Sequence, residues 1–130
     1  MSTVLFVCLH NAGRSQMSRA LFDQAAAAHH RALSAGSVAD PSGHVHTEVV
    51  EVMRELGIDL SAVRPVRLTR ALAEQADVVV TMGCGDACPY IPGKRYIDWD
   101  LPDPKGQPLD AVRALRDEIA RRVDDLLTTL

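Results

Sequence analysis

The chain alternates short, continuous apolar runs with longer stretches in which apolar residues recur at helical spacing. Apolar runs rich in β-branched residues are typical of strands buried on both faces, and apolar residues three or four positions apart are typical of amphipathic helices. The predicted strands are Thr3–Val7, Ala32–Ser37, Asp77–Met82 and Arg95–Trp99. The predicted helices are Gln16–His30, Thr47–Leu56 followed by Gly57 as a stop, Thr69–Gln75 capped by Thr69, and Leu109–Leu130. This alternation predicts one α/β domain over residues 1–130, with a parallel sheet of about four strands and helices on both faces.

Composition narrows the class of protein. The 130 residues carry a formal net charge of −3 and are 47% hydrophobic, which suits a folded domain with a buried core. The lack of a basic excess disfavours a nucleic-acid partner, and no apolar stretch approaches the ~18 residues of a membrane span. The N-terminal residues lack the pattern of a signal peptide. We therefore expect a cytoplasmic protein, in which the three cysteines are reactive, metal-binding or buried and do not form a disulfide framework.

The segment after the first predicted strand, Cys8–Ser15 (CLHNAGRS), is the strongest candidate for chemistry. A loop between a strand and a helix turns backbone N–H groups inward, and Arg14 adds a planar fork that fits two oxygens of a tetrahedral oxyanion. Both features stabilise a thiolate at Cys8, which makes it a nucleophile at neutral pH. We expect Ser15 to donate a hydrogen bond to this thiolate and Asn11 to hold the loop's shape. The alternative is that Cys8 is an ordinary core residue. We call Cys8–Ser15 the anion loop.

Two further cysteines, Cys84 and Cys88, follow the third predicted strand in the sequence GCGDACP. Glycines flank Cys84, so the segment bends easily, and a spacing of four residues lets two thiols approach each other if the segment is helical. Two thiols in a bendable segment beside an anion site are what a redox relay needs. One alternative is a zinc site completed by His44 or His46, and another is that both thiols are simply packed in the interior.

Taken together, CLHNAGRS followed by QMSRA, the run DVVVTM, the Cys84–Cys88 segment and Asp103–Pro104 resemble the low-molecular-weight protein tyrosine phosphatase fold. Within that fold, the chain looks most like the arsenate reductases that use three cysteines, and the resemblance covers nearly the whole chain. It departs from the family at His10, where glycine is usual, and at Gly13, where a second cysteine is frequent. Arg19 stands where some reductases carry a potassium-binding acid, so we expect no potassium site. We also expect no other metal and no cofactor.

The resemblance implies a role for each candidate residue. Cys8 attacks arsenate, Cys84 releases arsenite by forming a disulfide with Cys8, and Cys88 takes over that disulfide and presents it at the surface. Asp103, which Pro104 follows, acts as the general acid that protonates the leaving oxygen. An Asp-Pro pair is also an ordinary turn, which is the alternative at this position. The oxyanion would be bound by the loop residues Asn11, Gly13, Arg14 and Ser15, and phosphate or sulfate could fill the same site.

We therefore expect an arsenate reductase that serves arsenic detoxification and receives electrons from thioredoxin, or alternatively from a small thiol. A second hypothesis is a phosphatase that hydrolyses phosphate esters through a Cys8 phospho-enzyme, with Arg14 and Asp103 but neither later cysteine. Tyrosine phosphatases of this fold tend to carry aromatic residues after the Asp-Pro pair, whereas this chain has Lys105–Gly106–Gln107. A third hypothesis is a module that binds oxyanions or senses redox state without catalysis.

Overall fold

A parallel sheet of four strands forms the centre of the computed structural model, which describes residues 1–83 and 90–130. The strands are β1 (Thr3–Cys8), β2 (Arg31–Gly36), β3 (Val78–Thr81) and β4 (Arg95–Asp98). They lie in the order β2-β1-β3-β4, and each neighbouring pair is parallel. The chain leaves β1 toward one side for β2 and later returns to its other side for β3. The carboxyl end of β1 is therefore the switch point at which open α/β sheets bind ligands.

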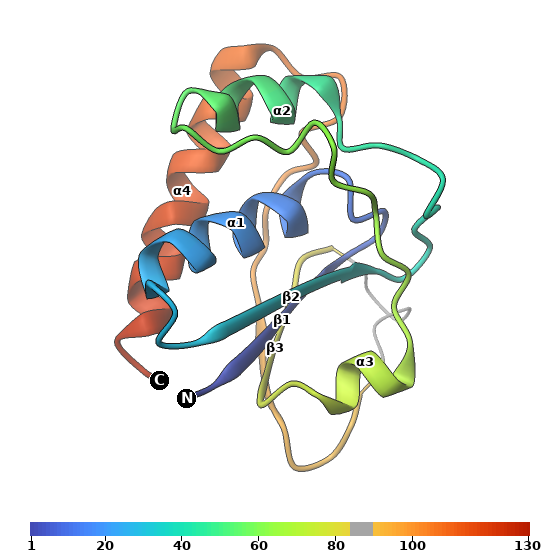
Figure 1. Ribbon diagram of the computed structural model, residues 1–130, viewed down its shortest axis with the longest axis vertical. Coiled ribbons are helices and arrows are strands. Elements are labelled where there is room, and N and C mark those ends of the chain that lie inside the picture. The colour runs from blue at the N-terminus through green and yellow to red at the C-terminus, as the bar shows by residue number, and fades with distance from the viewer. Residues whose placement is uncertain (84–89) are drawn as a thin grey trace.

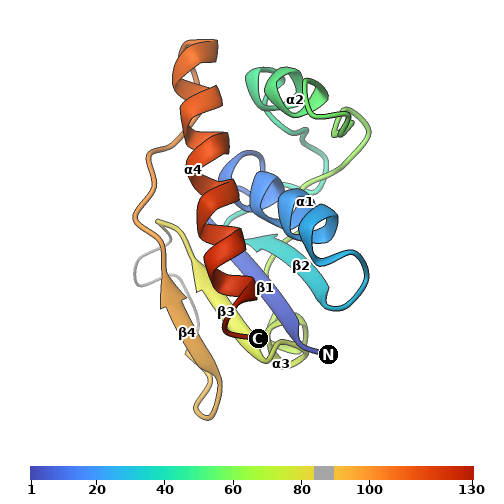
Figure 2. The same ribbon diagram turned by 90° about the vertical axis from the view of Figure 1, so that its left-hand side faces the viewer.

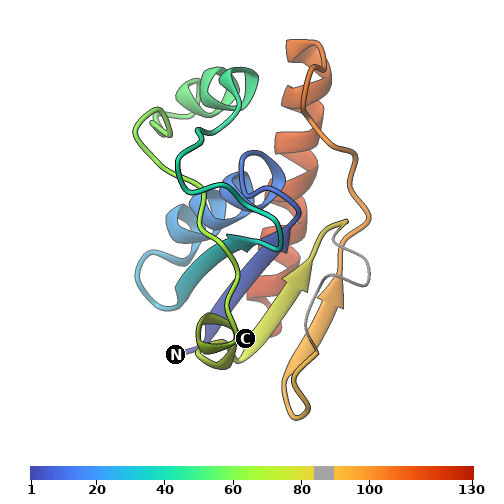
Figure 3. The same cartoon turned by 90° about the vertical axis from the view of Figure 1, so that its right-hand side faces the viewer.

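Helices cover both faces of this sheet, so the predicted fold class is confirmed. The helices α1 (Arg14–Ala26), α2 (Thr47–Arg54) and α4 (Leu109–Leu127) lie on one side (Figure 1, Figure 2). The short helix α3 (Arg70–Glu74) lies on the opposite side, in front of the sheet in Figure 3. Among the helices of residues 1–83 and 90–130, none is both long and apolar enough to cross a membrane.

Residues of β1 alternate between two apolar clusters. Val4, Phe6 and Cys8 belong to the larger cluster with α1, α2 and α4, while Leu5 and Val7 belong to the smaller one with α3. A strand places successive side chains on opposite faces, so burial on both faces requires an unbroken apolar run. That requirement explains why TVLFV shows no polar alternation.

The first helix is shorter at its C-terminal end than the predicted range Gln16–His30. It ends at Ala26, because Ala27 and Ala28 adopt left-handed backbone angles with φ of 49° and 69°. The turn carries the chain straight into β2, which pairs with β1 along its whole length. Sheet pairing thus overrides the helix propensity of the alanines. The two histidines that were predicted to end the helix lie in the turn.

Two other helices also end before their predicted limits. The predicted helix Thr47–Leu56 stops at Arg54, and Leu56, which was expected on its buried face, is 40% exposed. The last helix ends at Leu127 and not at Leu130. The cap of α3 is confirmed, because the Thr69 hydroxyl accepts a hydrogen bond of 3.1 Å from the backbone N–H of Leu72.

An ionic cluster joins the end of α2 to α4. The guanidinium of Arg113 lies 2.8 Å from Glu55, and that of Arg116 donates to Glu55 and to the backbone carbonyl of Val52, each at 2.8 Å. The hydrogen bonds from Arg113 and then Arg116 lower the pKa of Glu55 from 4.5 to about 2. Because this pKa is lower in the folded chain, the carboxylate stabilises the fold above pH 4.5, and its contribution is lost as the pH falls toward 2.

We expect Glu55→Gln to lower the free energy of unfolding at pH 7 and to differ progressively less from the wild type as the pH falls below 4.5. Urea unfolding at a series of pH values between 7 and 3 measures the difference. Glu51→Gln, at an exposed position of α2, is the control and should show a smaller difference throughout. A Glu55→Gln deficit that stayed constant with pH would contradict this account.

Candidate functional site

The anion loop runs from the end of β1 into the first turn of α1 and buries its thiol. Cys8 is 2% exposed, and Asn11 and Ser15 are fully buried. The sulfur of Cys8 lies 2.8 Å from the hydroxyl oxygen of Ser15 and accepts a hydrogen bond of 3.3 Å from the backbone N–H of Asn11. A thiolate needs such donors when it is removed from water. The surroundings of Cys8 therefore suit a nucleophile better than an inert core thiol.

Asn11 gives the loop its shape. Its φ of 54° lies in the left-handed region, which asparagine tolerates better than most residues. The side-chain amide donates to the hydroxyl of Ser15 at 2.7 Å, and its carbonyl oxygen accepts from the backbone N–H of Val66 at 2.8 Å. The loop is thus tied both to α1 and to the distant chain segment that precedes α3.

Arg14, the first residue of α1, is only 8% exposed and is held from two sides. Its guanidinium donates to the backbone carbonyl of Leu101 at 3.3 Å and lies 4.0 Å from the carboxylate of Asp103. A β-carbon at Gly83 would lie 2.6 Å from Nη1 of Arg14, so the guanidinium can hold this position only while residue 83 has no side chain. These contacts fix the direction of the guanidinium, which is what bidentate recognition of an oxyanion requires.

The Asp103–Pro104 pair forms a turn that rests on the anion loop. One carboxylate oxygen of Asp103 accepts from the backbone N–H of Lys105 at 3.0 Å, as in an Asx turn. A β-carbon at Gly13 would lie 2.7 Å from the ring of Pro104, so the turn approaches the loop closely because position 13 has no side chain. The side chain of Asp103 remains half exposed beside Arg14. The structure thus confirms the turn at Asp103–Pro104, and the role of Asp103 as a general acid remains a prediction.

His46, which the sequence analysis named only as a possible zinc ligand, is a neighbour of the anion loop. Its backbone N–H donates to the carbonyl of Ala12 at 2.9 Å, and its ring carbon would lie 3.4 Å from a β-carbon at Gly13. Burial lowers the pKa of His46, although the nearby charges of Glu48 and Asp103 act in the opposite direction. With His10, which the sequence places inside the loop, it lines a hollow of about 190 Å³.

Residues from segments that are distant in the sequence also shape the anion loop. A β-carbon at Gly36 would lie 2.6 Å from the carbonyl oxygen of Leu9 and 2.7 Å from the backbone nitrogen of Asn11. Gly36 ends β2 as Gly83 follows β3, and a glycine at the carboxyl end of a strand beside the loop is a signal that could have been read from the sequence. The backbone donor of Val66 has no such signal, because a backbone N–H is present at almost every residue.

Cys84 and Cys88 lie outside the described residues, so the redox relay and the zinc alternative both remain predictions. In the part of the chain that the structure describes, no group of three His, Cys, Asp or Glu side chains is arranged to hold a metal ion.

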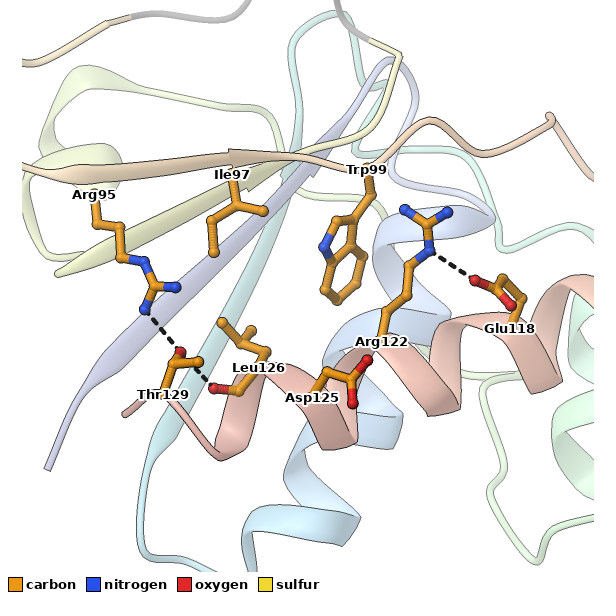
Figure 4. Close-up of a pocket in the computed structure, with 8 residues that line it drawn as sticks. All are labelled: Arg95, Ile97, Trp99, Glu118, Arg122, Asp125, Leu126 and Thr129. Atoms are coloured by element: carbon orange, nitrogen blue, oxygen red, sulfur yellow. Dashed lines mark hydrogen bonds and ion pairs between the residues drawn. The ribbon is translucent and has the colours of Figure 1, made fainter.

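A larger hollow of about 430 Å³ lies between β4 and α4 (Figure 4). Trp99, Leu126 and Ile97 form part of its wall, and none of its lining residues belongs to the anion loop. Its two arginines already have partners, since Arg95 donates to the hydroxyl of Thr129 and Arg122 pairs with Glu118 (Figure 4). We therefore assign the candidate chemistry to the anion loop.

Comparison with known proteins gives consistent relatives. Residues 3–88 match the model of the low molecular weight phosphotyrosine protein phosphatase family. A putative arsenate reductase from Halobacterium salinarum is 42% identical over 126 residues, which cover 93% of this chain and 87% of the relative. A thioredoxin-dependent arsenate reductase from Corynebacterium glutamicum superposes with a TM-score of 0.84 at 39% identity. The match covers 99% of this chain but 61% of that one. A low molecular weight protein tyrosine phosphatase from T. tengcongensis gives a TM-score of 0.90 at 28% identity, with both chains fully covered.

We expect Gly83→Ala to weaken the binding of phosphate or arsenate by at least about tenfold, because the new methyl group displaces Arg14. Gly93→Ala is the matched control, since Gly93 has a similar φ of 89° but has nothing within 4 Å of its β-carbon. Both variants should lose about 1–2 kcal/mol of stability to the left-handed backbone. Isothermal titration calorimetry with each anion separates them, and equal affinity in the two variants would remove Arg14 from the anion site.

Proposed function

This chain belongs to the low molecular weight phosphotyrosine protein phosphatase family and groups with its arsenate reductases, and we propose that it reduces arsenate to arsenite through Cys8. The observation that carries the proposal is a buried thiol that accepts a backbone hydrogen bond, in a loop that also positions a buried guanidinium. The same chain carries two further cysteines, which reduction needs and phosphate hydrolysis does not.

In the first step, the Cys8 thiolate attacks arsenic and a sulfur–arsenic bond forms. One hydroxyl group of arsenate takes a proton from Asp103 and leaves as water, so this step consumes no electrons. Arg14 and the N–H groups of the anion loop bind the remaining oxygens and offset the charge that gathers on them.

In the second step, the thiolate of Cys84 attacks the sulfur of Cys8. A disulfide forms, the sulfur–arsenic bond breaks, and its electron pair stays on arsenic, which leaves as arsenite. Cys88 then attacks the sulfur of Cys84, which frees Cys8 as a thiolate and leaves a Cys84–Cys88 disulfide. The two electrons that reduce arsenic thus come from two cysteine sulfurs and must be replaced by an external donor.

Thioredoxin is the donor that we favour, because a protein dithiol attacks an intramolecular disulfide of this kind. The thioredoxin-dependent relative from Corynebacterium glutamicum supports this choice. A small thiol that acts directly on the arsenic adduct is the alternative. The reducing cytoplasm, where such donors keep thiols reduced, is the compartment that suits this chemistry, and arsenic detoxification is the purpose it would serve.

Phosphate-ester hydrolysis is the second candidate. It needs Cys8, Arg14 and Asp103, and the similarity to the phosphatase from T. tengcongensis favours it. The polar run Lys105–Gly106–Gln107 follows the Asp-Pro pair and offers no aromatic ring to flank a phenol, which argues against phosphotyrosine as the substrate. A module that only binds oxyanions would retain affinity for arsenate without turnover.

We expect the two later cysteines to separate these functions. With arsenate, thioredoxin, thioredoxin reductase and NADPH, Cys84→Ser should release no arsenite, and Cys88→Ser should complete one turnover and stall with Cys8 joined to Cys84. Tryptic mass spectrometry identifies that disulfide. Hydrolysis of p-nitrophenyl phosphate, where it occurs, should be nearly unchanged in both variants, because it consumes no electrons. Normal arsenate turnover in both variants would exclude the relay.

We expect Arg14→Lys to lower kcat/KM for arsenate by about 100-fold or more, because a point charge cannot replace two parallel donors. Cys8→Ser is the reference for complete loss and should abolish both reduction and any phosphatase activity. Coupled NADPH oxidation measures both variants. An Arg14→Lys enzyme with near-normal kcat/KM would show that the oxyanion is held by other groups.

A further inference from the structure

Gln16 is a buried polar residue that the mechanism above does not use. It is the third residue of α1, and its side chain is 1% exposed. Its amide nitrogen donates to the side-chain oxygen of Asn11 at 2.9 Å and reaches the backbone carbonyl of Arg64 at 3.5 Å. It therefore contacts the residue that gives the anion loop its shape without reaching the thiol itself.

The hydrogen bonds around Asn11 have one consistent direction. The backbone N–H of Val66 can only donate, so the atom of Asn11 that faces it must be the oxygen. The nitrogen of the same amide then donates to the Ser15 hydroxyl oxygen at 2.7 Å. Since that oxygen already accepts, the hydrogen of the Ser15 hydroxyl is free to point at the sulfur of Cys8, 2.8 Å away. In this network Ser15 donates to the thiolate.

Gln16 is the second donor to the oxygen of Asn11, so it reinforces the orientation on which this direction depends. The side-chain oxygen of Gln16 is buried and has no hydrogen-bond partner among the described residues, so it contributes no hydrogen bond to stability. A buried carbonyl oxygen without a partner lowers stability, and a leucine of similar size would avoid that cost. A residue that costs stability while it supports a reactive group is typical of a functional site.

We propose that Gln16 is a positioning residue that raises the reactivity of Cys8 through Asn11 and Ser15. The proposal deepens the proposed function, since it rests on Cys8 as the nucleophile. It makes two predictions that a purely structural role does not. Replacing Gln16 should slow the reaction of the Cys8 thiol without lowering the melting temperature. This effect should disappear when Ser15 has lost its hydroxyl group.

The test measures the alkylation of Cys8 by iodoacetamide, which reacts with thiolates, in a Cys84→Ser/Cys88→Ser background where Cys8 is the sole thiol. Gln16→Leu should slow the reaction at pH 7 by about threefold to tenfold, with a melting temperature equal to or above that of the parent. Gln16→Glu should slow it at least as much, because a carboxylate cannot donate to the oxygen of Asn11. Gln24→Leu, on the exposed side of α1, is the control and should have no effect.

A double-mutant cycle then identifies the route. Ser15→Ala should slow alkylation by itself, and adding Gln16→Leu to it should produce no further change. An equal slowing by Gln16→Leu with and without Ser15 would overturn the proposal, as would an unchanged rate in Gln16→Leu or a loss of rate that follows a fall in melting temperature.

Assays of the enzyme with all three cysteines distinguish this inference from the proposed function. There, Gln16→Leu should lower kcat for arsenate by a larger factor than it weakens the binding of sulfate, because Arg14, which Gln16 does not contact, still binds the anion. If no variant or parent reduces arsenate while the alkylation results hold, the reductase assignment fails and the role of Gln16 stands.

Discussion

The side-chain amide of Asn11 is the contact on which the rest of the site depends. Its oxygen accepts hydrogen bonds from the side chain of Gln16 and from the backbone N–H of Val66, and its nitrogen donates to the hydroxyl oxygen of Ser15. A loop with a left-handed residue at its centre would otherwise have many conformations of similar energy. With these three hydrogen bonds made, the loop keeps one conformation, in which the backbone N–H of Asn11 and the hydroxyl of Ser15 face the sulfur of Cys8 before any substrate arrives. Such preorganisation avoids the cost of rearranging dipoles during the reaction.

Close backbone approach is the second requirement, and glycines supply it. Gly36 lets β2 pass directly under the anion loop, Gly83 leaves room for the guanidinium of Arg14, and Gly13 lets the turn at Pro104 rest on the loop. Each of these glycines is approached by a different part of the site: Gly36 by the loop backbone, Gly83 by the guanidinium of Arg14, and Gly13 by the ring of Pro104. Cys8, Arg14 and Asp103, for which we propose the roles of nucleophile, anion-binding group and proton donor, are thus brought together by chain segments that meet around one short loop at the carboxyl edge of the sheet.

The sequence by itself determined much of this protein. Short apolar runs rich in β-formers, such as TVLFV, are typical of strands covered on both faces, so the parallel sheet and its helical layers could be predicted. Cys8, Asn11, Arg14 and Ser15 lie within one short segment, and their proximity follows from chain connectivity and from the turn that joins a strand to a helix. The same is true of the Thr69 cap, whose partner is three residues away.

Only the tertiary structure decided the contacts that join distant segments. Nothing local indicates that the carbonyl of Leu101 holds Arg14, that Val66 orients Asn11, or that Pro104 rests on Gly13. The tertiary structure also decides that α1 ends at Ala26. An alanine-rich helix would continue if β2 did not have to pair with the first residue of β1. Local propensities differ by a fraction of a kilocalorie per residue, whereas sheet pairing and close packing depend on partners whose positions are known only when the whole chain has folded.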